Sequence, residues 1–159
     1  KVAEIIKDYN DQGLKVGTVA VDANGIGSGV AYGLRTMQEE GIISCYAIVP
    51  LMVQEKAREN TKFADKRTEL AIALGERFRL GQIDLTRLHT NGKIDDFEAQ
   101  AVNMKRERES RGLRLRLMSK DDYRKEHKIS PDDFDALCYT FLDTSDTFAD
   151  NYLSLISCG

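Results

Sequence analysis

Two short apolar runs joined by an amphipathic segment constrain the fold of this chain most strongly. Residues 16–21 and residues 42–49 contain the β-branched side chains that favour strands. Residues 28–40, between them, repeat apolar positions at helical spacing. The apolar face of that helix is predicted to carry Val30, Leu34 and Met37. Nearly continuous apolar strands connected through a helix are typical of a parallel sheet covered on both sides, so the sequence predicts an α/β fold.

Helices are predicted on either side of this unit. Residues 1–12 have a helical pattern, and Pro50 is expected to end the second strand. A charged stretch, residues 54–66, is expected to lead into a further helix that stops at Gly81. The stripe of this helix is predicted to include Phe63, Arg67, Leu70, Leu74 and Phe78.

The second half of the chain is predicted to contain short strands and helices. Residues 82–85 and 113–119 have the pattern of short strands, with residues 93–110 between them as a helix and a hairpin-like return. The last strong element is a helix within residues 130–142. A capping box is predicted there from Ser130 as N-cap, Pro131 as first residue and Asp133 as third.

Asp135 has an unusual position in this last helix. The stripe expected to pack on the sheet consists of Phe134, Leu137, Cys138, Phe141 and Leu142. Asp135 lies about 100° from Phe134 around the helix and so borders the stripe, and Asp132 shares its edge. Acidic residues in a first helical turn commonly complement the helix dipole. That explanation suits Asp132 and Asp133 better than Asp135, which is therefore a candidate functional residue.

The composition of the chain limits which folds and functions are possible. At 159 residues and 42% hydrophobic, the chain suits one core, so we predict a single domain over residues 1–159. The formal net charge of −3 gives no overall attraction to nucleic acid, so such binding would need a local basic patch. Three cysteines without metal-ligand spacing predict no zinc site. The absence of a long apolar run argues against a membrane span and for a soluble protein.

The loop after the first strand has two readings, because glycines stand at positions 25, 27 and 29. Such a loop can cradle a phosphate at a helix N-terminus, which would suit a small phosphate- or nucleotide-binding α/β domain. However, "GIGSGV" lacks the third glycine of the dinucleotide fingerprint, and no Lys-Ser/Thr pair follows it. The other reading is a tight strand-to-helix turn, in which glycine provides a positive φ and close packing.

Asp22 points to a third reading, because it lies at the expected carboxyl end of a strand, where open α/β sheets bind their ligands. Asp132 and Asp135 form a second acidic group. Carboxylates from two elements are what a hard cation such as Mg²⁺ requires. Two such ions about 4 Å apart can activate water and stabilise the leaving oxygen in phosphodiester hydrolysis, although this chemistry usually needs three or four carboxylates.

Four segments together resemble a known family, the C-terminal nuclease domain of the large terminase subunit of tailed phages and prophages. They are "VAVDANGIGSGVAYGL" (19–34), "FADKRTELAIALGERFRLGQIDL" (63–85), "LRLMSKDDYRKE" (115–126) and "SPDDFDAL" (130–137). The resemblance implies a ribonuclease H-like three-layer fold with a mainly parallel central sheet. It also implies an endonuclease that cuts concatemeric DNA during genome packaging in the bacterial cytoplasm.

The resemblance also implies site residues. Asp22 and one or more of Asp132, Asp133 and Asp135 would bind Mg²⁺ or Mn²⁺, and the helical geometry favours Asp135, then Asp132. Within the matched segments, Lys66, Arg67 and Lys120 are the candidates for contacting DNA. Implied partners are double-stranded DNA, the ATPase motor domain, the portal and the small terminase subunit.

The chain also departs from the family pattern. The first catalytic aspartate of the family lies on strands preceding the helix that opens at Lys1, and no ATPase motif occurs in the sequence. We therefore expect an N-terminally truncated domain that binds metal weakly and that self-associates through an uncovered sheet edge. The alternative is a catalytically inactive prophage remnant that binds at most DNA or another protein.

Charge is distributed unevenly near the last helices. Residues 105–128 carry ten Lys and Arg against five Asp and Glu, whereas residues 129–150 carry six Asp and no Lys or Arg. A basic segment beside an acidic one suits a protein that grips phosphates next to a metal site, although a solvated hairpin would show the same pattern. His89 and His127 lie in polar segments and are expected at the surface.

Overall fold

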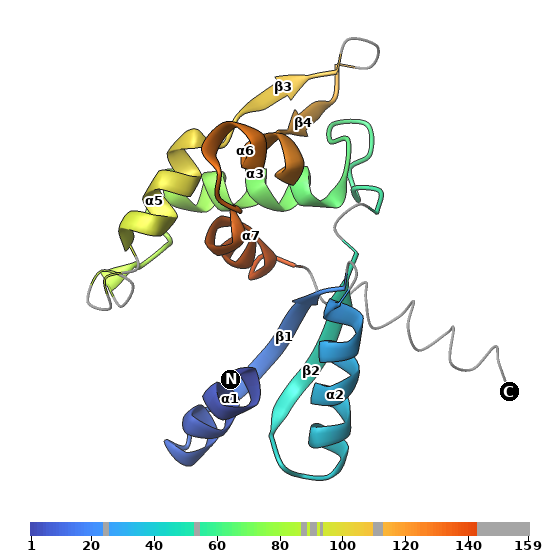
Figure 1. The fold of residues 1–159 in the computed structure, drawn as a ribbon, viewed down its shortest axis with the longest axis vertical. Helices are drawn as coiled ribbons and strands as arrows, with labels where there is room; N and C mark the ends of the chain where they lie inside the picture. Colours follow the sequence, from blue (N-terminus) through green and yellow to red (C-terminus); the bar gives the residue numbers. More distant parts are fainter. Residues whose placement is uncertain are drawn as a thin grey trace, which may run out of the picture. The chain divides into compact units, whose positions relative to one another are not determined.

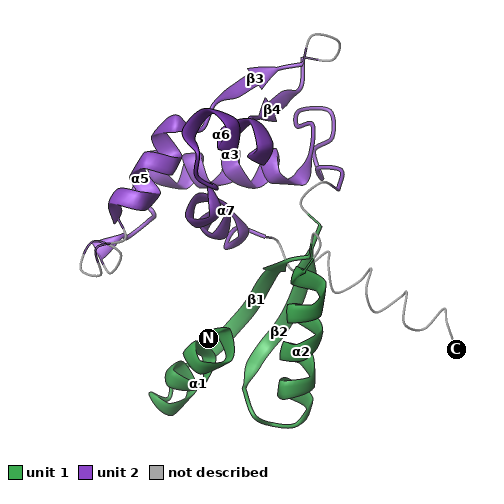
Figure 2. Ribbon diagram, viewed as in Figure 1, with its two compact units in different colours: residues 1–52, 143–159 green, residues 53–142 purple. Residues whose placement is uncertain are grey.

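A computed structural model of the chain describes residues 1–23, 26–52, 55–86, 89, 92, 94–109 and 113–142 (Figure 1). The described residues fall into two compact units (Figure 2). Unit 1 is described within residues 1–52, and unit 2 within residues 53–142. No helix in the described ranges is both long and apolar enough to cross a membrane. The single domain expected over residues 1–159 stays a prediction.

Unit 1 has the order helix, strand, helix, strand. Its elements are α1 (Val2–Asp11), β1 (Val16–Asp22), α2 (Gly27–Glu39) and β2 (Cys45–Leu51). The two strands pair in parallel, with Val16 opposite Cys45 and Asp22 opposite Leu51. Parallel neighbours need a crossover connection, which α2 provides here. The predicted parallel α/β unit is therefore confirmed.

The core of unit 1 lies where the helices meet the strand pair. It consists of Ile6, Ala31, Leu34, Ile43 and Ile48. The predicted face of α2 is partly wrong, because Val30 and Met37 are 42% and 37% exposed while Ala31 is buried beside Leu34. The buried stripe of α2 is narrower than predicted, since the small side chain of Ala31 faces the core. β1 is half-buried along most of its length rather than buried, whereas β2 is buried at Ile48 and its neighbours.

Pro50 does not end the second strand as predicted. It lies inside β2, opposite Val21. The next residue, Leu51, accepts a 2.9 Å hydrogen bond from the Ala23 amide, so the backbone groups of Leu51 face β1. Backbone groups alternate in direction along a strand, so those of Pro50 face away from β1, and its missing N–H removes no bond from this ladder.

Unit 2 is mainly helical and includes one small hairpin (Figure 1). Its named elements are α3 (Lys66–Arg79), α5 (Ile94–Asn103), β3 (Arg106–Arg108), β4 (Leu115–Leu117), α6 (Lys120–His127) and α7 (Asp132–Tyr139). The strands β3 and β4 are antiparallel, with Arg106 opposite Leu117. The buried stripe of α3 carries Arg67, Leu70 and Leu74 as predicted. Phe63 instead precedes the helix, and Phe78 is 39% exposed although its ring stacks on Phe97.

Two predictions for the middle of the chain are wrong. Residues 82–85 do not form a strand, and the helix expected over residues 93–110 is only α5, which ends at Asn103. The charged residues after it form β3, whose residues are all exposed. Alternating charges suit a solvated strand as well as a helix, and pairing with β4 decides between them here. The hairpin-like return exists, but it joins β3 to β4.

The start of α7 also differs from the predicted capping box. The N-cap is Pro131, which offers no side-chain cap, instead of Ser130. The buried side chain of Gln100 from α5 replaces that cap. Its Oε1 accepts a hydrogen bond from the Phe134 amide at 3.0 Å, and its Nε2 donates to Asp133 Oδ2 at 2.8 Å. Gln100 therefore joins α5 to the N-terminus of α7 and satisfies a backbone donor there.

Candidate functional site

Asp22 lies where the sequence places it, at the carboxyl end of β1. It is the last residue of the strand and stands opposite Leu51. The 2.9 Å hydrogen bond from the Ala23 amide to the Leu51 carbonyl continues the pairing one residue further. Asp22 itself is half-buried, and Ala23 is buried. In open α/β folds this end of a parallel strand pair is where ligands bind, which suits a carboxylate with a chemical role.

The glycines after Asp22 have different surroundings. A Cβ placed on Gly27, the first residue of α2, would lie 1.6 Å from the Asp22 carbonyl oxygen, whereas a Cβ on Gly29 would meet nothing within 4 Å. Neither glycine has a positive φ. The close packing expected of the strand-to-helix turn is therefore present at Gly27, while the expected positive φ is absent from both. Gly25 lies outside the described residues.

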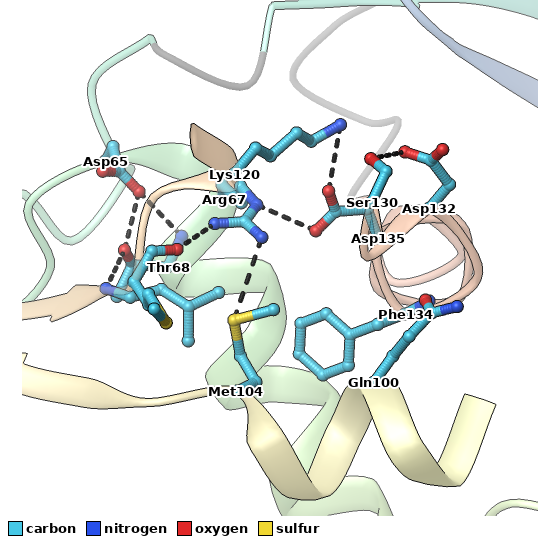
Figure 3. A network of polar contacts seen from close by, with 12 residues as sticks. Asp65, Arg67, Thr68, Gln100, Met104, Lys120, Ser130, Asp132, Phe134 and Asp135 are labelled. Carbon is cyan, nitrogen blue, oxygen red and sulfur yellow. Dashed lines mark hydrogen bonds and ion pairs between the residues drawn. The ribbon is translucent and has the colours of Figure 1, made fainter. Parts of the chain in front are cut away.

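In unit 2, three predicted site residues come together from three helices (Figure 3). Asp135 of α7 is 1% exposed, and its Oδ1 accepts a 2.8 Å hydrogen bond from Nε of Arg67 in α3. Nζ of Lys120 in α6 lies 3.0 Å from Oδ2 of Asp135 and forms an ion pair. That oxygen accepts no aligned hydrogen bond from any described residue. Asp135 thus lies beside the buried stripe of α7, as predicted, and is itself buried.

Arg67 is the central donor of this network. It is 7% exposed. Its Nη1 donates to the Met118 carbonyl at 2.6 Å, and its Nη2 lies 3.9 Å from Sδ of Met104. A guanidinium with its donors held inside the unit orients a carboxylate more readily than it reaches a DNA backbone. DNA contact by Arg67 stays a prediction, and the position of its side chain supports a positioning role.

The remaining predicted site residues lie outside this network. Nζ of Lys66 is 3.9 Å from Oε2 of Glu69, and the lysine side chain is 21% exposed. Asp132 is exposed, and its Oδ1 accepts a 2.6 Å hydrogen bond from the Ser130 hydroxyl. The contacts of Asp132 are therefore local to the start of α7. Asp22 belongs to unit 1 and is positioned by the elements of that unit.

The basic segment, residues 105–128, is partly neutralised by its own carboxylates. Glu109 accepts hydrogen bonds from Arg116 and Arg114. The hydrogen bond from Arg116, with a smaller contribution from Arg114, holds the pKa of Glu109 below its usual value. Lys105 pairs with Glu126 on α6. In the described part of this segment, surface ion pairs therefore offset part of the positive charge.

Two histidines and two cysteines lie among the described residues. His89 is exposed as expected, whereas His127 is half-buried with its ring tilted against Tyr123, 4.5 Å between centroids. Burial, and then the charge of Asp135, raises the pKa of the Cys138 thiol to about 12, while Arg67 opposes the shift. Burial also raises the pKa of Cys45. Both thiols are therefore poor nucleophiles at neutral pH.

The donor chemistry of the described residues fits a divalent cation only in part. No group of three or more His, Cys, Asp or Glu side chains within the described ranges could hold a metal ion. Oδ2 of Asp135, however, is a buried carboxylate oxygen without an aligned hydrogen bond, and such an oxygen is suited to a cation.

The sequence interpretation missed two polar residues that hold the network together. Thr68 is completely buried, and its hydroxyl donates to Asp65 Oδ1 at 2.7 Å while accepting the Leu117 amide at 3.0 Å. An Asp three residues before a Thr at a helix start is a recognisable capping signal for this pair. The second residue is Gln100, which follows Phe97 by three positions on the apolar face of α5. A lone glutamine at such a position is the only local signal of its role.

No protein-family model and no curated protein matches this chain. The described residues form a parallel βαβ unit followed by helices and a small hairpin, and this fold matches that of solved terminase nuclease domains. The predicted fold class is therefore confirmed.

The solved structures with a similar fold include three of the nuclease domain of the large terminase subunit gp2 of bacterial virus Sf6. A lysine-to-alanine variant with manganese has a TM-score of 0.62 at 16% identity, covering 86% of this chain and 70% of that one. The same variant with calcium has a TM-score of 0.57 and the unmodified domain 0.56, both at 18% identity and covering 86% of this chain and 69% of those. At such low identity the likeness establishes the fold.

Proposed function

We propose that this chain is a divalent-metal-dependent DNA endonuclease domain of the kind found in phage large terminase subunits. One observation carries the proposal: over 86% of its length the chain has the fold of such a domain. In that fold Asp22 ends a strand of a parallel pair, the position expected for a ligand-binding carboxylate. The substrate is double-stranded DNA, and the context is cutting during genome packaging together with the motor domain.

In unit 1, Asp22 is proposed as a ligand of Mg²⁺ or Mn²⁺, and in unit 2 Asp135 and Asp132 are proposed as ligands. Buried Oδ2 of Asp135 supports this assignment, because its only partner among the described residues is the ammonium group of Lys120. A bound divalent ion would supply an activated water and stabilisation of the leaving oxygen in phosphodiester hydrolysis.

The cationic residues have different proposed roles. Arg67 holds the Asp135 carboxylate in one orientation through its 2.8 Å hydrogen bond. Lys120 and Lys66, whose side chains are 24% and 21% exposed, retain access to solvent and are proposed to contact the DNA backbone. Such contacts position the duplex without selecting its sequence.

Cleavage of supercoiled plasmid in the presence of Mn²⁺ tests the proposal. The chain should nick and linearise the plasmid, and Asp22→Asn should abolish this activity because a neutral amide is a poor ligand for a hard cation. The matched control is Asp121→Asn, which changes an exposed aspartate at the start of α6. That variant should cleave at the wild-type rate.

Two results would overturn the proposal. A folded wild-type chain that neither cleaves DNA nor binds Mn²⁺ by calorimetry would favour the inactive, binding-only alternative. Full activity in Asp22→Asn would show that the cation is held elsewhere. The Asp135→Asn variant is less decisive alone, because it also breaks the buried pair with Arg67.

A further inference from the structure

The first turn of α2 sits directly on the end of β1. A Cβ on Gly27 would lie 1.6 Å from the Asp22 carbonyl oxygen, 2.7 Å from its carbonyl carbon and 3.8 Å from Cγ1 of Val21. Real Cβ atoms essentially never approach another heavy atom within 3.0 Å. A side chain at this position would therefore need about 1.4 Å of extra room from backbone atoms, which cannot rotate away as a side-chain tip can.

Gly27 differs from the other glycines of α2 in this respect. Gly29 and Gly33 belong to the same helix, yet a Cβ on either would meet nothing within 4 Å. Gly27 does not have a positive φ, so its backbone conformation is one that any residue adopts. The requirement for glycine at position 27 is therefore one of space against Asp22.

A second contact ties the same turn to the same strand end. The hydroxyl of Ser28 donates a 2.8 Å hydrogen bond to the Ala23 carbonyl. The Ala23 amide in turn donates to Leu51 at 2.9 Å. Ala23 is thus bonded to both α2 and β2, and Val21 is paired with β2. These contacts fix the peptide groups from which the Asp22 side chain extends.

We propose that Gly27 is a positioning residue for Asp22, with Ser28 assisting it. The absent side chain of Gly27 lets α2 rest on the Asp22 carbonyl, and this contact holds the carboxylate at the orientation that a divalent ligand requires. The inference rests on the proposed function, because it gives Asp22 a metal to bind. Gly27 itself contacts no metal or substrate.

A measurement without metal tests the positioning directly. Hydrogen exchange of the Ala23 amide, followed by NMR, reports opening of the strand end. In Gly27→Ala this exchange should be about tenfold faster or more, while the interior β1 and β2 amides change little. The matched controls Gly29→Ala and Gly33→Ala add the same methyl group to open space and should leave the Ala23 amide within about twofold of wild type.

A second measurement tests the consequence for the ligand. The dissociation constant for Mn²⁺ should rise about tenfold or more in Gly27→Ala, a loss typical of disturbing the support of a metal ligand. If Gly27 acts through Asp22, adding Gly27→Ala to Asp22→Asn should change Mn²⁺ affinity by no more than about twofold. This absence of additivity separates positioning from a general loss of folding.

The outcomes separate this inference from the proposed function. Wild-type exchange of the Ala23 amide in Gly27→Ala overturns the inference whether or not the chain binds metal. A uniform loss of protection across unit 1, or unchanged Mn²⁺ affinity beside faster exchange, overturns it as well. A wild-type chain that fails to bind Mn²⁺ overturns the proposed function alone. Should Gly27→Ala not fold, Ser28→Ala provides the same test, and unchanged Ala23 exchange in that variant counts against the inference.

Discussion

The two units hold their candidate carboxylates by opposite means. In unit 1, Asp22 is positioned through its main chain, by pairing with β2 and by the packing of Gly27 on its carbonyl. In unit 2, Asp135 is positioned through its side chain, by Arg67 on one oxygen and Lys120 on the other. The first arrangement depends on a missing side chain, and the second depends on a carboxylate and a guanidinium that are almost completely buried, beside a lysine that is 24% exposed.

This difference predicts different sensitivities. Packing between backbone atoms does not depend on side-chain charge. It leaves no room for added atoms, because backbone atoms cannot move independently. A buried ion pair contributes little net stability compared with an apolar pair, yet removing one partner leaves an uncompensated charge and is strongly destabilising. Single substitutions should therefore have their largest effects in unit 2 where a charge is removed, and in unit 1 where a methyl group is added.

The largest effect is expected for Arg67→Ala. It leaves Asp135 buried with Lys120 as its remaining cation and removes the donor to the Met118 carbonyl. We expect the free energy of unfolding of unit 2 to fall by about 3–5 kcal/mol. Hydrogen exchange of α3 and α7 amides measures the change.

The matched control for that substitution is Arg79→Ala. Arg79 ends the same helix and pairs with Glu76 at 2.6 Å, but both side chains are exposed. Solvent screens an exposed pair, which therefore contributes little to stability, so this variant should unfold almost like wild type. Equal losses of unfolding free energy in the two arginine variants would show that burial does not change what these ion pairs contribute. The expected difference between paired charges inside and outside the network would then be wrong.

A smaller loss is expected for Gln100→Ala. The substitution leaves the Phe134 amide without its acceptor at the buried start of α7 and removes a donor to Asp133. Loss of a helix cap typically costs about 0.5–2 kcal/mol. Urea denaturation measures it, with Asn103→Ala as a control, because Asn103 donates to the exposed Ala99 carbonyl of its own helix. A Gln100→Ala variant as stable as this control would argue against the side-chain cap.

Much of this fold was predictable because local sequence patterns determine it. The spacing of apolar residues predicted α1, β1, α2 and β2, and the position of Asp22 at a strand end followed from it. Errors arose where tertiary contacts overrule local preference. Pro50 remains within β2 because its backbone faces away from β1, and residues 106–108 form a strand because β4 is available to pair with them.

The network around Asp135 was predictable only in part. Helical periodicity placed Asp135 beside the buried stripe, and that burial is confirmed. Periodicity within single helices cannot show which side chains of different helices meet, so the pairing of Asp135 with Arg67 was not anticipated. The Gln100 cap has the same origin, since its partners lie 33 and 34 residues away. Ligation of a cation by Asp22 and Asp135 stays a prediction.

The two described cysteines should contribute differently to the pH dependence of stability. The pKa of Cys138 in unit 2 is raised to about 12 from an ordinary 9.0, chiefly by burial. Above pH 9 the unfolded thiol loses its proton while the folded one keeps it, so the free energy of unfolding falls as pH rises towards 12. Below pH 9 both states are protonated, and the stabilising contribution is complete. The decline is about 1.4 kcal/mol per pH unit.

Replacing each cysteine in turn measures its share of that alkaline decline. Cys138→Ala should flatten the decline, whatever its effect on stability at neutral pH, because the slope depends only on proton release. Cys45→Ala in unit 1 should change the slope less, since Cys45 is only half-buried. Urea midpoints collected from neutral pH to above pH 9 provide the comparison. Equal slopes in the two variants would mean that the thiol of Cys138 is not desolvated in solution.

The smallest expected effect is a gain in unit 1. Gly33 lies in the middle of α2, and a Cβ there would meet nothing within 4 Å. Gly33→Ala should therefore stabilise the helix by about 0.5–1 kcal/mol, because alanine loses less backbone entropy than glycine when it becomes helical. Exchange of the α2 amides measures this gain. The same substitution at Gly27 should have the opposite sign, since its methyl group would meet the Asp22 carbonyl. A gain in helix stability at both positions would show that α2 can move off the strand end. The backbone contact in unit 1 would then not be sensitive to substitution in the way that the buried ion pair in unit 2 is.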